Sequence, residues 1–226
     1  MIDNYNLCLE TLKKLHRAKV LDKITVIGSW CIFFYKEYFK DQPYHPTLRT
    51  RDIDFLIPLP PPRWPGHVDI PSLLDELGFA VVHSQSTGAI KLSHPMLSVE
   101  FLVPEQGRGS DKPMSFPELK INAQRLRFLN YLLEDSITVV YEKLPLRLPH
   151  PARFALHKII VATRRKNKDK AARDMEQALS LIESLLREGQ RSSLDKALQA
   201  MPPSWLKLLR KKIHPLEERF PELSRS

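Results

Sequence analysis

The sequence is poor in cysteine and contains no long apolar run. Its 226 residues include only Cys8 and Cys31, which are too few for a disulfide framework and show no metal-ligand spacing. No apolar stretch approaches the roughly 20 residues that a membrane-spanning helix needs. The N-terminal residues lack the apolar core of a signal peptide. These absences argue against a disulfide-rich secreted scaffold and an integral membrane protein, and we expect a reduced, cytoplasmic setting with no membrane partner.

The sequence also lacks the histidine motifs of zinc enzymes. Its eight histidines form no His-Glu-x-x-His motif and no Cys/His cluster. His157 is followed by Lys158, but adjacent residues on a helix point about 100° apart. We therefore interpret His157 as a packing or hydrogen-bonding residue rather than as a catalytic acid or base.

Positive charge is concentrated in the last third of the chain. The net charge is +9, with 18 Lys and Arg against 17 Asp and Glu in residues 1–150, and 17 against 9 in residues 151–226. A basic segment beside a nearly neutral one suggests an anionic partner such as a nucleic acid or a nucleotide phosphate. A solvated helical surface explains the same charge equally well.

The hydrophobic pattern divides the chain near Pro149–Pro151. Residues 1–150 have the pattern of a mixed α/β (α+β) domain with a mixed sheet, and residues 151–226 that of an all-helical, basic C-terminal domain. Predicted strands are 24–27, 51–57, 80–83, 89–92, 98–103, 137–141 and 144–148. Predicted helices are 4–19, 30–39, 72–77, 152–165, 168–188, 192–200, 203–212 and 215–220. Residues 105–118 are predicted to be a loop.

Two aspartates interrupt an apolar strand in "RDIDFLI". Residues two apart on a strand point to the same face, so Asp52 and Asp54 project side by side. Glu100 occupies a similar strand, "VEFLV", and joins the pair if the two strands are neighbours. Three close carboxylates repel one another, and oxygen-only ligands suit Mg²⁺ or Mn²⁺. The solvated strand face remains the alternative.

A glycine and a serine follow the first predicted strand and precede a predicted helix. Such a turn presents free backbone N–H groups that bind phosphate, and glycine allows a ligand to approach the backbone closely. Gly28 and Ser29 are therefore candidates for phosphate contact. A Gly-Ser pair is more often simply a turn or a helix cap.

The order "GSW…TRDIDFLIP…VEFLVP" resembles the polymerase-beta-type nucleotidyltransferase superfamily. Within it, the sequence is most similar to the bacterial branch of small uncharacterised nucleotidyltransferase-like proteins, which is related to toxin-type nucleotidyltransferases. The helical segments "HPARFALHKIIVATRR" and "KAARDMEQAL" extend the resemblance, which spans about residues 24–180. The connection of 22 residues between Ser29 and Asp52 is longer than the common pattern.

The resemblance implies roles for several residues. Asp52, Asp54 and Glu100 would be the catalytic, metal-binding acids for Mg²⁺ or Mn²⁺. Gly28 and Ser29 would contact the triphosphate of an NTP such as ATP.

The resemblance also makes residues after Pro151 candidates for phosphate contact. Lys158, Arg164 and Arg165 are these candidates. The two arginines otherwise fit the last turn of a helix, where cations are favoured. Asp174 matches an acid of the family, or pairs with Lys170 one turn earlier.

The predicted function is metal-dependent transfer of a nucleoside monophosphate from an NTP to an acceptor hydroxyl. The basic C-terminal part favours RNA, such as a tRNA 3′ end, as the acceptor. A protein hydroxyl or an aminoglycoside-like molecule is also compatible. The alternatives are a nucleotide- or RNA-binding module without transfer, a toxin–antitoxin component that modifies a protein, and a sugar-nucleotide glycosyltransferase that uses its Asp-x-Asp motif.

Overall fold

The chain folds into two compact units, Met1–Pro149 and His150–Ser226. The computed structural model describes residues 4–40, 44, 50–84, 87–105 and 112–209. Within these ranges, no helix has both the length and the apolar character needed to cross a membrane. The predicted helix at 215–220 and the end of the one at 203–212 lie outside the described residues.

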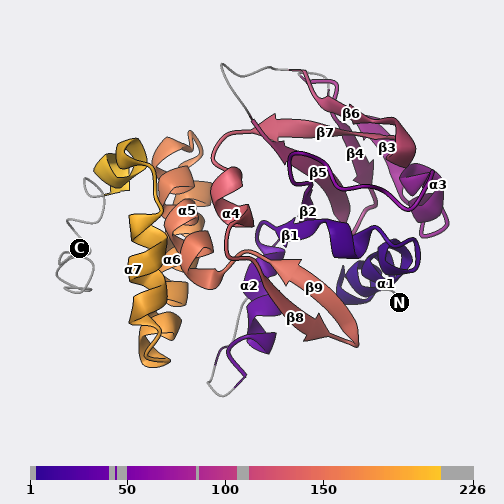
Figure 1. The fold of residues 1–226 in the computed structure, drawn as a ribbon. Helices are drawn as coiled ribbons and strands as arrows, with labels where there is room; N and C mark the ends of the chain where they lie inside the picture. Colours follow the sequence, from indigo (N-terminus) through magenta and orange to yellow (C-terminus); the bar gives the residue numbers. More distant parts are fainter. Residues whose placement is uncertain (1–3, 41–43, 45–49, 85–86, 106–111, 210–226) are drawn as a thin grey trace. The chain divides into compact units, whose positions relative to one another are not determined.

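The first unit is built on a mixed sheet, as predicted (Figure 1). Its strands run in the order β1-β2-β5-β4-β3, and β7 pairs with both β5 and β6. The β2–β5 and β5–β7 pairs are parallel, and the other pairs are antiparallel. The strands are β1 Thr25–Ile27, β2 Asp52–Leu56, β3 Ala80–His83, β4 Ile90–Ser93, β5 Ser98–Pro104, β6 Met114–Phe116 and β7 Ile121–Leu126.

Short helices and one hairpin complete this unit. The helices are α1 Asn4–Arg17, α2 Trp30–Phe34, α3 Ile70–Asp75 and α4 Asn130–Leu133, and the hairpin consists of β8 Ile137–Tyr141 and β9 Leu144–Leu148. The α1 helix is amphipathic, because the spacing of its apolar side chains places Leu12 and Leu15 on one buried face with Cys8. Burial of such a face, rather than helix propensity, stabilises a helix of this length.

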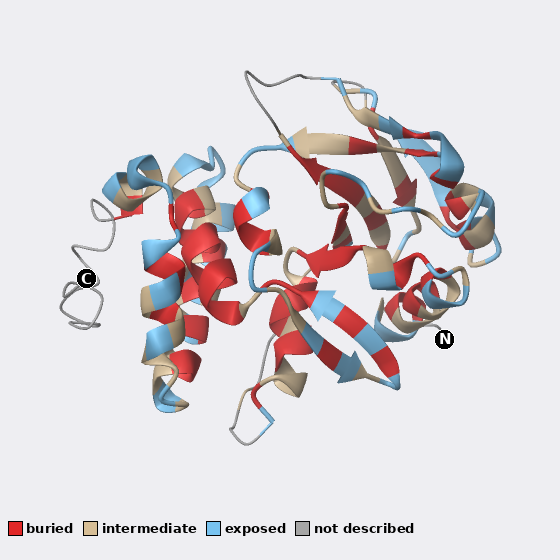
Figure 2. Cartoon of the chain, in the orientation of Figure 1, coloured by how far each residue is buried: buried red, intermediate tan, exposed pale blue. Residues whose placement is uncertain are grey.

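The central strands bury one face and leave the other polar. Ile53 and Phe55 of β2 are fully buried, whereas Asp52 and Asp54 alternate with them and are more accessible. The ring of Phe55 stacks on that of Phe101 in β5, with centroids 5.5 Å apart. Figure 2 shows the same strands largely in the colour of buried residues. The sheet therefore has an apolar face that carries the core and a face on which polar side chains gather.

Parts of the first unit differ from the sequence prediction. The predicted loop 105–118 was wrong from Met114 onward, where strand β6 and the start of a 3-10 helix, Pro117–Leu119, are found, and residues 106–111 lie outside the described residues. Strand β7 and helix α4 were not predicted. The predicted helix 30–39 ends as an α-helix at Phe34 and continues as a 3-10 turn, Tyr35–Glu37. Segments this short have too few residues for a periodic pattern to reveal them.

The second unit is helical over its described residues. It contains α5 Pro151–Arg164, α6 Lys168–Arg187, α7 Arg191–Gln199 and a further helical segment at 203–209. Proline is tolerated in the first turn of α5, and His150 Nδ1 accepts a hydrogen bond from the Ala152 N–H at 3.2 Å. The first ten residues of α5 are all buried, as expected for a central helix that is apolar around most of its circumference. The three predicted helices 152–165, 168–188 and 192–200 are confirmed.

Candidate active site

The register of β2 and β5 brings the three predicted acids onto one face of the sheet. Asp54 lies directly opposite Glu100 in the parallel pair, and Asp52 lies opposite Ser98. Paired residues on neighbouring strands point to the same side, so the three carboxylates share the polar face. Asp54 and Glu100 are half-buried, and Asp52 is exposed. The structure thus pairs two acids, Asp54 and Glu100, that are 46 residues apart in the chain.

The turn after β1 lies against the second aspartate. Ile27, the last residue of β1, pairs with Asp54, so Gly28 follows immediately beside that carboxylate. Gly28 has a φ of +74°, and a side-chain carbon placed there would overlap Asp54 Oδ2 and lie 3.2 Å from Asp54 Cγ. Glycine is therefore required twice, for its left-handed backbone and for the space that Asp54 occupies.

Ser29 precedes α2 but does not cap it. Its side chain makes no capping hydrogen bond, and α2 contains only five residues. A helix so short adds little dipole to the site. The turn lies between a strand and a helix, as the sequence predicted, and what it contributes is the close approach of the Gly28 backbone to Asp54.

A lysine that sequence reasoning missed connects two of the acids. Lys91 in β4 pairs with Glu100 across the antiparallel β4–β5 ladder. Its Nζ donates to Glu100 Oε1 at 2.7 Å and to Asp52 Oδ1 at 2.9 Å. We call Asp52, Asp54, Glu100 and Lys91 the sheet cluster. It combines three carboxylates with one ammonium group, so its formal charge is −2 when all four are ionised.

The acids hold Lys91 in its charged form. Partial burial alone would lower the pKa of Lys91, but the hydrogen bonds and charges of Glu100 and Asp52 outweigh it. The net result is a pKa above the usual lysine value. The start of β4 is held in place by Asn122 in β7, whose side chain accepts from the Ile90 N–H and donates to the Gly88 carbonyl at 3.0 Å. The charged Lys91 side chain is therefore held in a defined position on the polar face of the sheet.

The donors of the sheet cluster suit a hard divalent cation. Among the described residues, no group of three or more His, Cys, Asp or Glu side chains converges closely enough to hold a metal ion. Two of the three carboxylates nevertheless already bind a cation, the Lys91 ammonium, between them. Carboxylate oxygens are the ligands that Mg²⁺ and Mn²⁺ prefer. The residues present therefore fit such a group in the chemistry of their donors and in sharing one face of the sheet, although their carboxylates do not converge on a single point.

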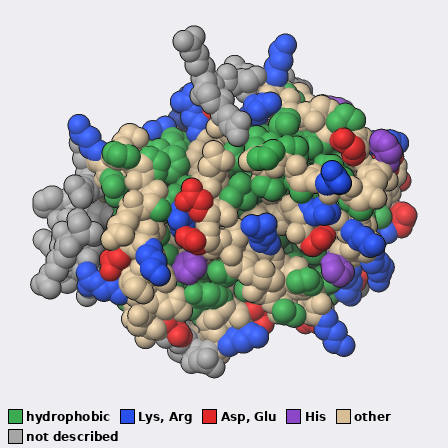
Figure 3. Space-filling view, in the orientation of Figure 1, with side chains coloured by type: hydrophobic (Ala, Val, Ile, Leu, Met, Phe, Trp, Pro, Cys, Tyr) green, Lys and Arg blue, Asp and Glu red, His purple; other side chains and the backbone are tan. Residues whose placement is uncertain are grey.

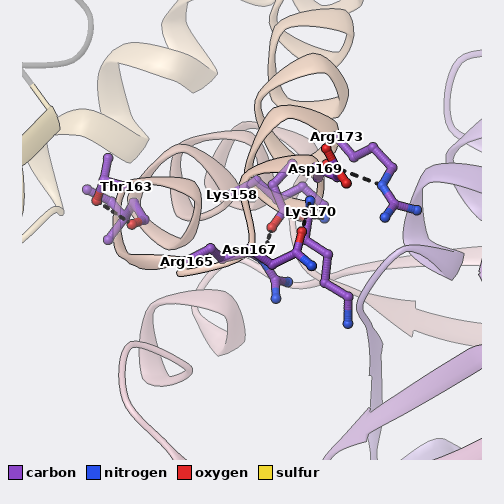
Figure 4. Close-up of polar contacts among 9 residues, drawn as sticks. Lys158, Thr163, Arg165, Asn167, Asp169, Lys170 and Arg173 are labelled. Carbon is purple, nitrogen blue, oxygen red and sulfur yellow. Dashed lines mark hydrogen bonds and ion pairs between the residues drawn. The ribbon is translucent and has the colours of Figure 1, made fainter.

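The candidate phosphate-binding residues of the second unit form an ion cluster of their own. Lys158 Nζ in α5 donates to Asp174 Oδ1 in α6 at 2.7 Å, and Arg165 Nε, directly after α5, donates to Asp174 Oδ2. We call these three residues the helix cluster. Figure 4 shows Lys158 and Arg165 beside the beginning of α6, where Asn167 caps the helix by accepting from the Lys170 N–H at 2.9 Å.

Burial defines the character of the helix cluster. The side chains of Lys158 and Asp174 are each only 7% exposed, and Lys158 Nζ lies 5.2 Å from the centre of the Phe154 ring. Asp174 thus reaches across to α5, whereas the sequence had left open a pairing with Lys170 inside α6. Arg164 is exposed at the end of α5. The phosphate roles of Lys158, Arg164 and Arg165 stay a prediction, and in the structure two of them are ion-paired with Asp174.

His157 is buried, as its interpretation as a packing residue requires. Desolvation first, and then the nearby positive charge of Lys158 and Arg165, lower the pKa of His157 to about 3, against the opposing effect of Asp174. Its Nε2 has no hydrogen-bond partner among the described residues. The imidazole is therefore neutral at physiological pH and contributes to packing.

A family model described as "Nucleotidyltransferase" matches residues 6–202. Because this match spans most of the chain, including both Asp52–Asp54 and Asp174, the chain belongs to this nucleotidyltransferase family. It is therefore an enzyme of the nucleotidyltransferase type with an NTP substrate. Among curated proteins, no sequence is similar enough to this chain to count as a match.

Several solved structures resemble the chain weakly. The antibiotic-resistance factor ANT(2'')-Ia in solution has 12% identity and a TM-score of 0.44, with 96% of this chain and 93% of that chain covered. Its crystal structure in complex with adenylyl-2''-tobramycin has 12% identity and a TM-score of 0.43, with 84% and 95% covered. An antigenic nucleotidyltransferase-like protein from Paracoccidioides brasiliensis has 14% identity and a TM-score of 0.39, with 86% and 92% covered. Similarity this low says nothing about what this chain binds.

Proposed function

We propose that the protein transfers a nucleoside monophosphate from an NTP to an acceptor hydroxyl at the polar face of the β2–β5 pair. The pairing of Asp54 with Glu100, directly beside the Gly28 turn, supports this proposal most strongly. In a member of the nucleotidyltransferase family, this arrangement places a backbone turn that a phosphate group can approach next to a set of carboxylates.

Each part of the face has a proposed role. Asp52, Asp54 and Glu100 would hold Mg²⁺ or Mn²⁺, which supplies charge neutralisation for the attacking and leaving oxygens of the displacement. Gly28 and Ser29 would approach the triphosphate through their backbone, because the Gly28 turn lies directly against the Asp54 carboxylate that would hold the metal. Of the two acids that pair with Lys91, Glu100 is the less exposed, and it would accept the proton of the acceptor hydroxyl.

For the acceptor we propose RNA. The support is electrostatic: residues 151–226 carry a net charge of +8, and contacts from Lys and Arg to phosphates contribute much of the affinity for nucleic acids. On the face drawn in Figure 3, basic side chains lie interspersed with acidic ones.

A labelled-nucleotide transfer assay tests the proposal. Wild type would meet each of the four NTPs with Mg²⁺ or Mn²⁺ and, in separate reactions, total RNA, a protein extract and an aminoglycoside mixture. We expect label on a discrete RNA. Asp52→Asn should reduce transfer by about a thousandfold or more, because the lost carboxylate acts on charge that develops in the transition state.

The matched control is Asp75→Asn, which removes an exposed carboxylate at the end of α3 in the same unit. It should leave transfer unchanged, and circular dichroism should show that all variants are folded. Undiminished transfer by Asp52→Asn would contradict the proposed site. Label on protein or on the aminoglycoside would replace RNA as the acceptor, and NTP binding without transfer to any acceptor would indicate a binding module.

A further inference from the structure

The sheet cluster contains a cation that belongs to the chain itself. Lys91 is the residue that fills this position, because its ammonium group lies within hydrogen-bond distance of both Asp52 and Glu100. These are two of the three acids proposed above to hold the metal. In the metal-free protein, these carboxylate oxygens therefore already contact the Lys91 ammonium group.

The position of Lys91 follows from the sheet and not from chance contact at the surface. Lys91 pairs with Glu100 in the β4–β5 ladder, and Glu100 pairs with Asp54 in the β2–β5 ladder. Three neighbouring strands thus place Lys91, Glu100 and Asp54 in one row. Asp52 lies two residues before Asp54 in β2, on the same face of the sheet. The lysine side chain is 34% exposed, so it has a path into solvent when another cation takes its place.

We propose that Lys91 is an internal counterion that competes with the divalent metal for Asp52 and Glu100. In the metal-free protein it relieves the repulsion between Asp52 and Glu100, the two carboxylates that it contacts. When a divalent ion binds, Lys91 must release the two oxygens that it holds, so its presence weakens binding of the metal alone. This inference rests on the proposed function, because it concerns the same metal site.

The competition has a consequence for the order of binding. A lysine released from the two carboxylates retains its positive charge and, because its side chain is partly exposed, can pair with another anionic group. The triphosphate of an NTP supplies one on the same face. We therefore expect the metal to bind more tightly in the presence of the NTP than on its own. Because coupled affinities are reciprocal, the metal should raise the affinity for the NTP by the same factor.

The test is calorimetric titration of the metal-free, full-length protein with Mn²⁺ and no NTP. Lys91→Met keeps most of the side-chain volume and removes the charge. We expect it to bind Mn²⁺ about tenfold more tightly than wild type, because two partly exposed ion pairs no longer have to be broken. Lys91→Arg retains the charge and should bind Mn²⁺ about as weakly as wild type.

A second measurement does not depend on the metal. In EDTA, the thermal unfolding midpoint of Lys91→Met should fall by about 2–4 °C, because Asp52 and Glu100 lose the ammonium group that they share. Added Mn²⁺ should restore it. Lys120→Met is the matched control, since it removes a lysine that pairs with Asp69 elsewhere in the same unit. That variant should bind Mn²⁺ with the affinity of wild type.

The possible failures are distinguishable. If Lys91→Met binds Mn²⁺ no more tightly than wild type, or more weakly, while wild type transfers label and Asp52→Asn does not, only the inference about Lys91 is overturned. If neither wild type nor Lys91→Met binds Mn²⁺ and no transfer is found, both the inference and the proposed metal-dependent reaction are overturned.

Discussion

The two units each contain an ion cluster, and the two clusters have opposite composition. The sheet cluster places one lysine among three carboxylates, and its side chains are 30–51% exposed where ion pairs are described. The helix cluster places one carboxylate between two cations, and the Lys158–Asp174 pair is 7% exposed on both sides. The sheet cluster has an excess of negative charge near water, whereas the helix cluster has a neutral buried pair, Lys158 and Asp174, with the additional positive charge of Arg165 at its exposed edge.

This difference indicates which ion pairs can be exchanged for a ligand. A partly exposed pair contributes up to about 1 kcal/mol, so another cation can replace the lysine at modest cost. Breaking a buried pair leaves an uncompensated charge in the interior and costs about 3–5 kcal/mol. The sheet cluster is thus suited to binding, whereas Asp174 in the helix cluster is suited to joining α5 to α6.

The largest expected effect comes from removing the buried carboxylate. Asp174→Ala should destabilise the second unit by about 3–5 kcal/mol, because Lys158 remains buried without its partner. Asp52→Asn, which alters an exposed pair, should change stability by less than about 1 kcal/mol. Hydrogen exchange of the α5 and α6 amides measures the first change, and exchange in β2 and β5 measures the second.

The double variant Lys158→Met/Asp174→Leu separates charge from packing. It removes both buried charges and should recover much of the stability that Asp174→Ala loses, since apolar side chains of similar volume replace a buried ion pair well. An Asp174→Ala protein with wild-type exchange in α5 and α6 would show that the helix cluster does not hold these helices together.

A smaller effect is expected from the histidine beside the helix cluster. Its pKa is about 3 in the folded protein and about 6.5 when unfolded, so the unfolded chain binds the proton first as the pH falls. The contribution of His157 to the free energy of unfolding should be constant above pH 6.5. Below pH 6.5 it should decline, and the loss should reach roughly 3 kcal/mol by pH 4.5.

Urea unfolding of wild type and His157→Leu between pH 7 and pH 4.5 measures this contribution as the difference between the two pH profiles. His67→Ala, which removes an exposed histidine of the first unit, serves as the control. Parallel profiles for wild type and His157→Leu would contradict a neutral, buried imidazole.

A stability effect smaller than that of His157 is expected at the Gly28 turn beside the sheet cluster. Gly28→Ala places a side chain at a φ of +74° and against the Asp54 carboxylate, which should cost about 1–2 kcal/mol. The same change should reduce transfer far more than it reduces stability, because it displaces Asp54. Gly88→Ala is the control: it also has a positive φ, but nothing lies within 4 Å of the added carbon. Equal loss of transfer by both variants would show that the crowding at Gly28 is unimportant.

The sequence predicted those parts of the fold whose pattern is local. The apolar strands with Asp52, Asp54 and Glu100 were predicted within one or two residues, as were the long helices α5 and α6. Strands β6 and β7 were missed, although "INAQRL" alternates buried and accessible residues. Three or six residues are too few for such alternation to stand out.

The part of the site that the sequence did not reveal depends on register. Lys91 occupies a predicted strand, but its role appears only when β4 is known to pair with β5 so that Lys91 faces Glu100. A shift of one residue would turn Lys91 to the opposite face. In the second unit, Asp174 was recognised as a matching acid, yet its partners lie 16 and 9 residues away, and only the packing of α5 against α6 identifies them.

The pairing of β2 with both β1 and β5 has a consequence for how relatives of this chain are recognised. The position of Asp54 is set by its pairing with Ile27 in β1 and with Glu100 in β5. It does not depend on the number of residues in the connections between these strands. The number of residues between α2 and Asp52 can therefore differ among relatives without moving the aspartates, whereas Trp30, Phe34 and Tyr35, in and directly after α2, belong to the buried core. A search pattern that allows this gap to vary, while holding Gly-Ser and Asp-x-Asp fixed, should detect family members that a rigid spacing rule rejects.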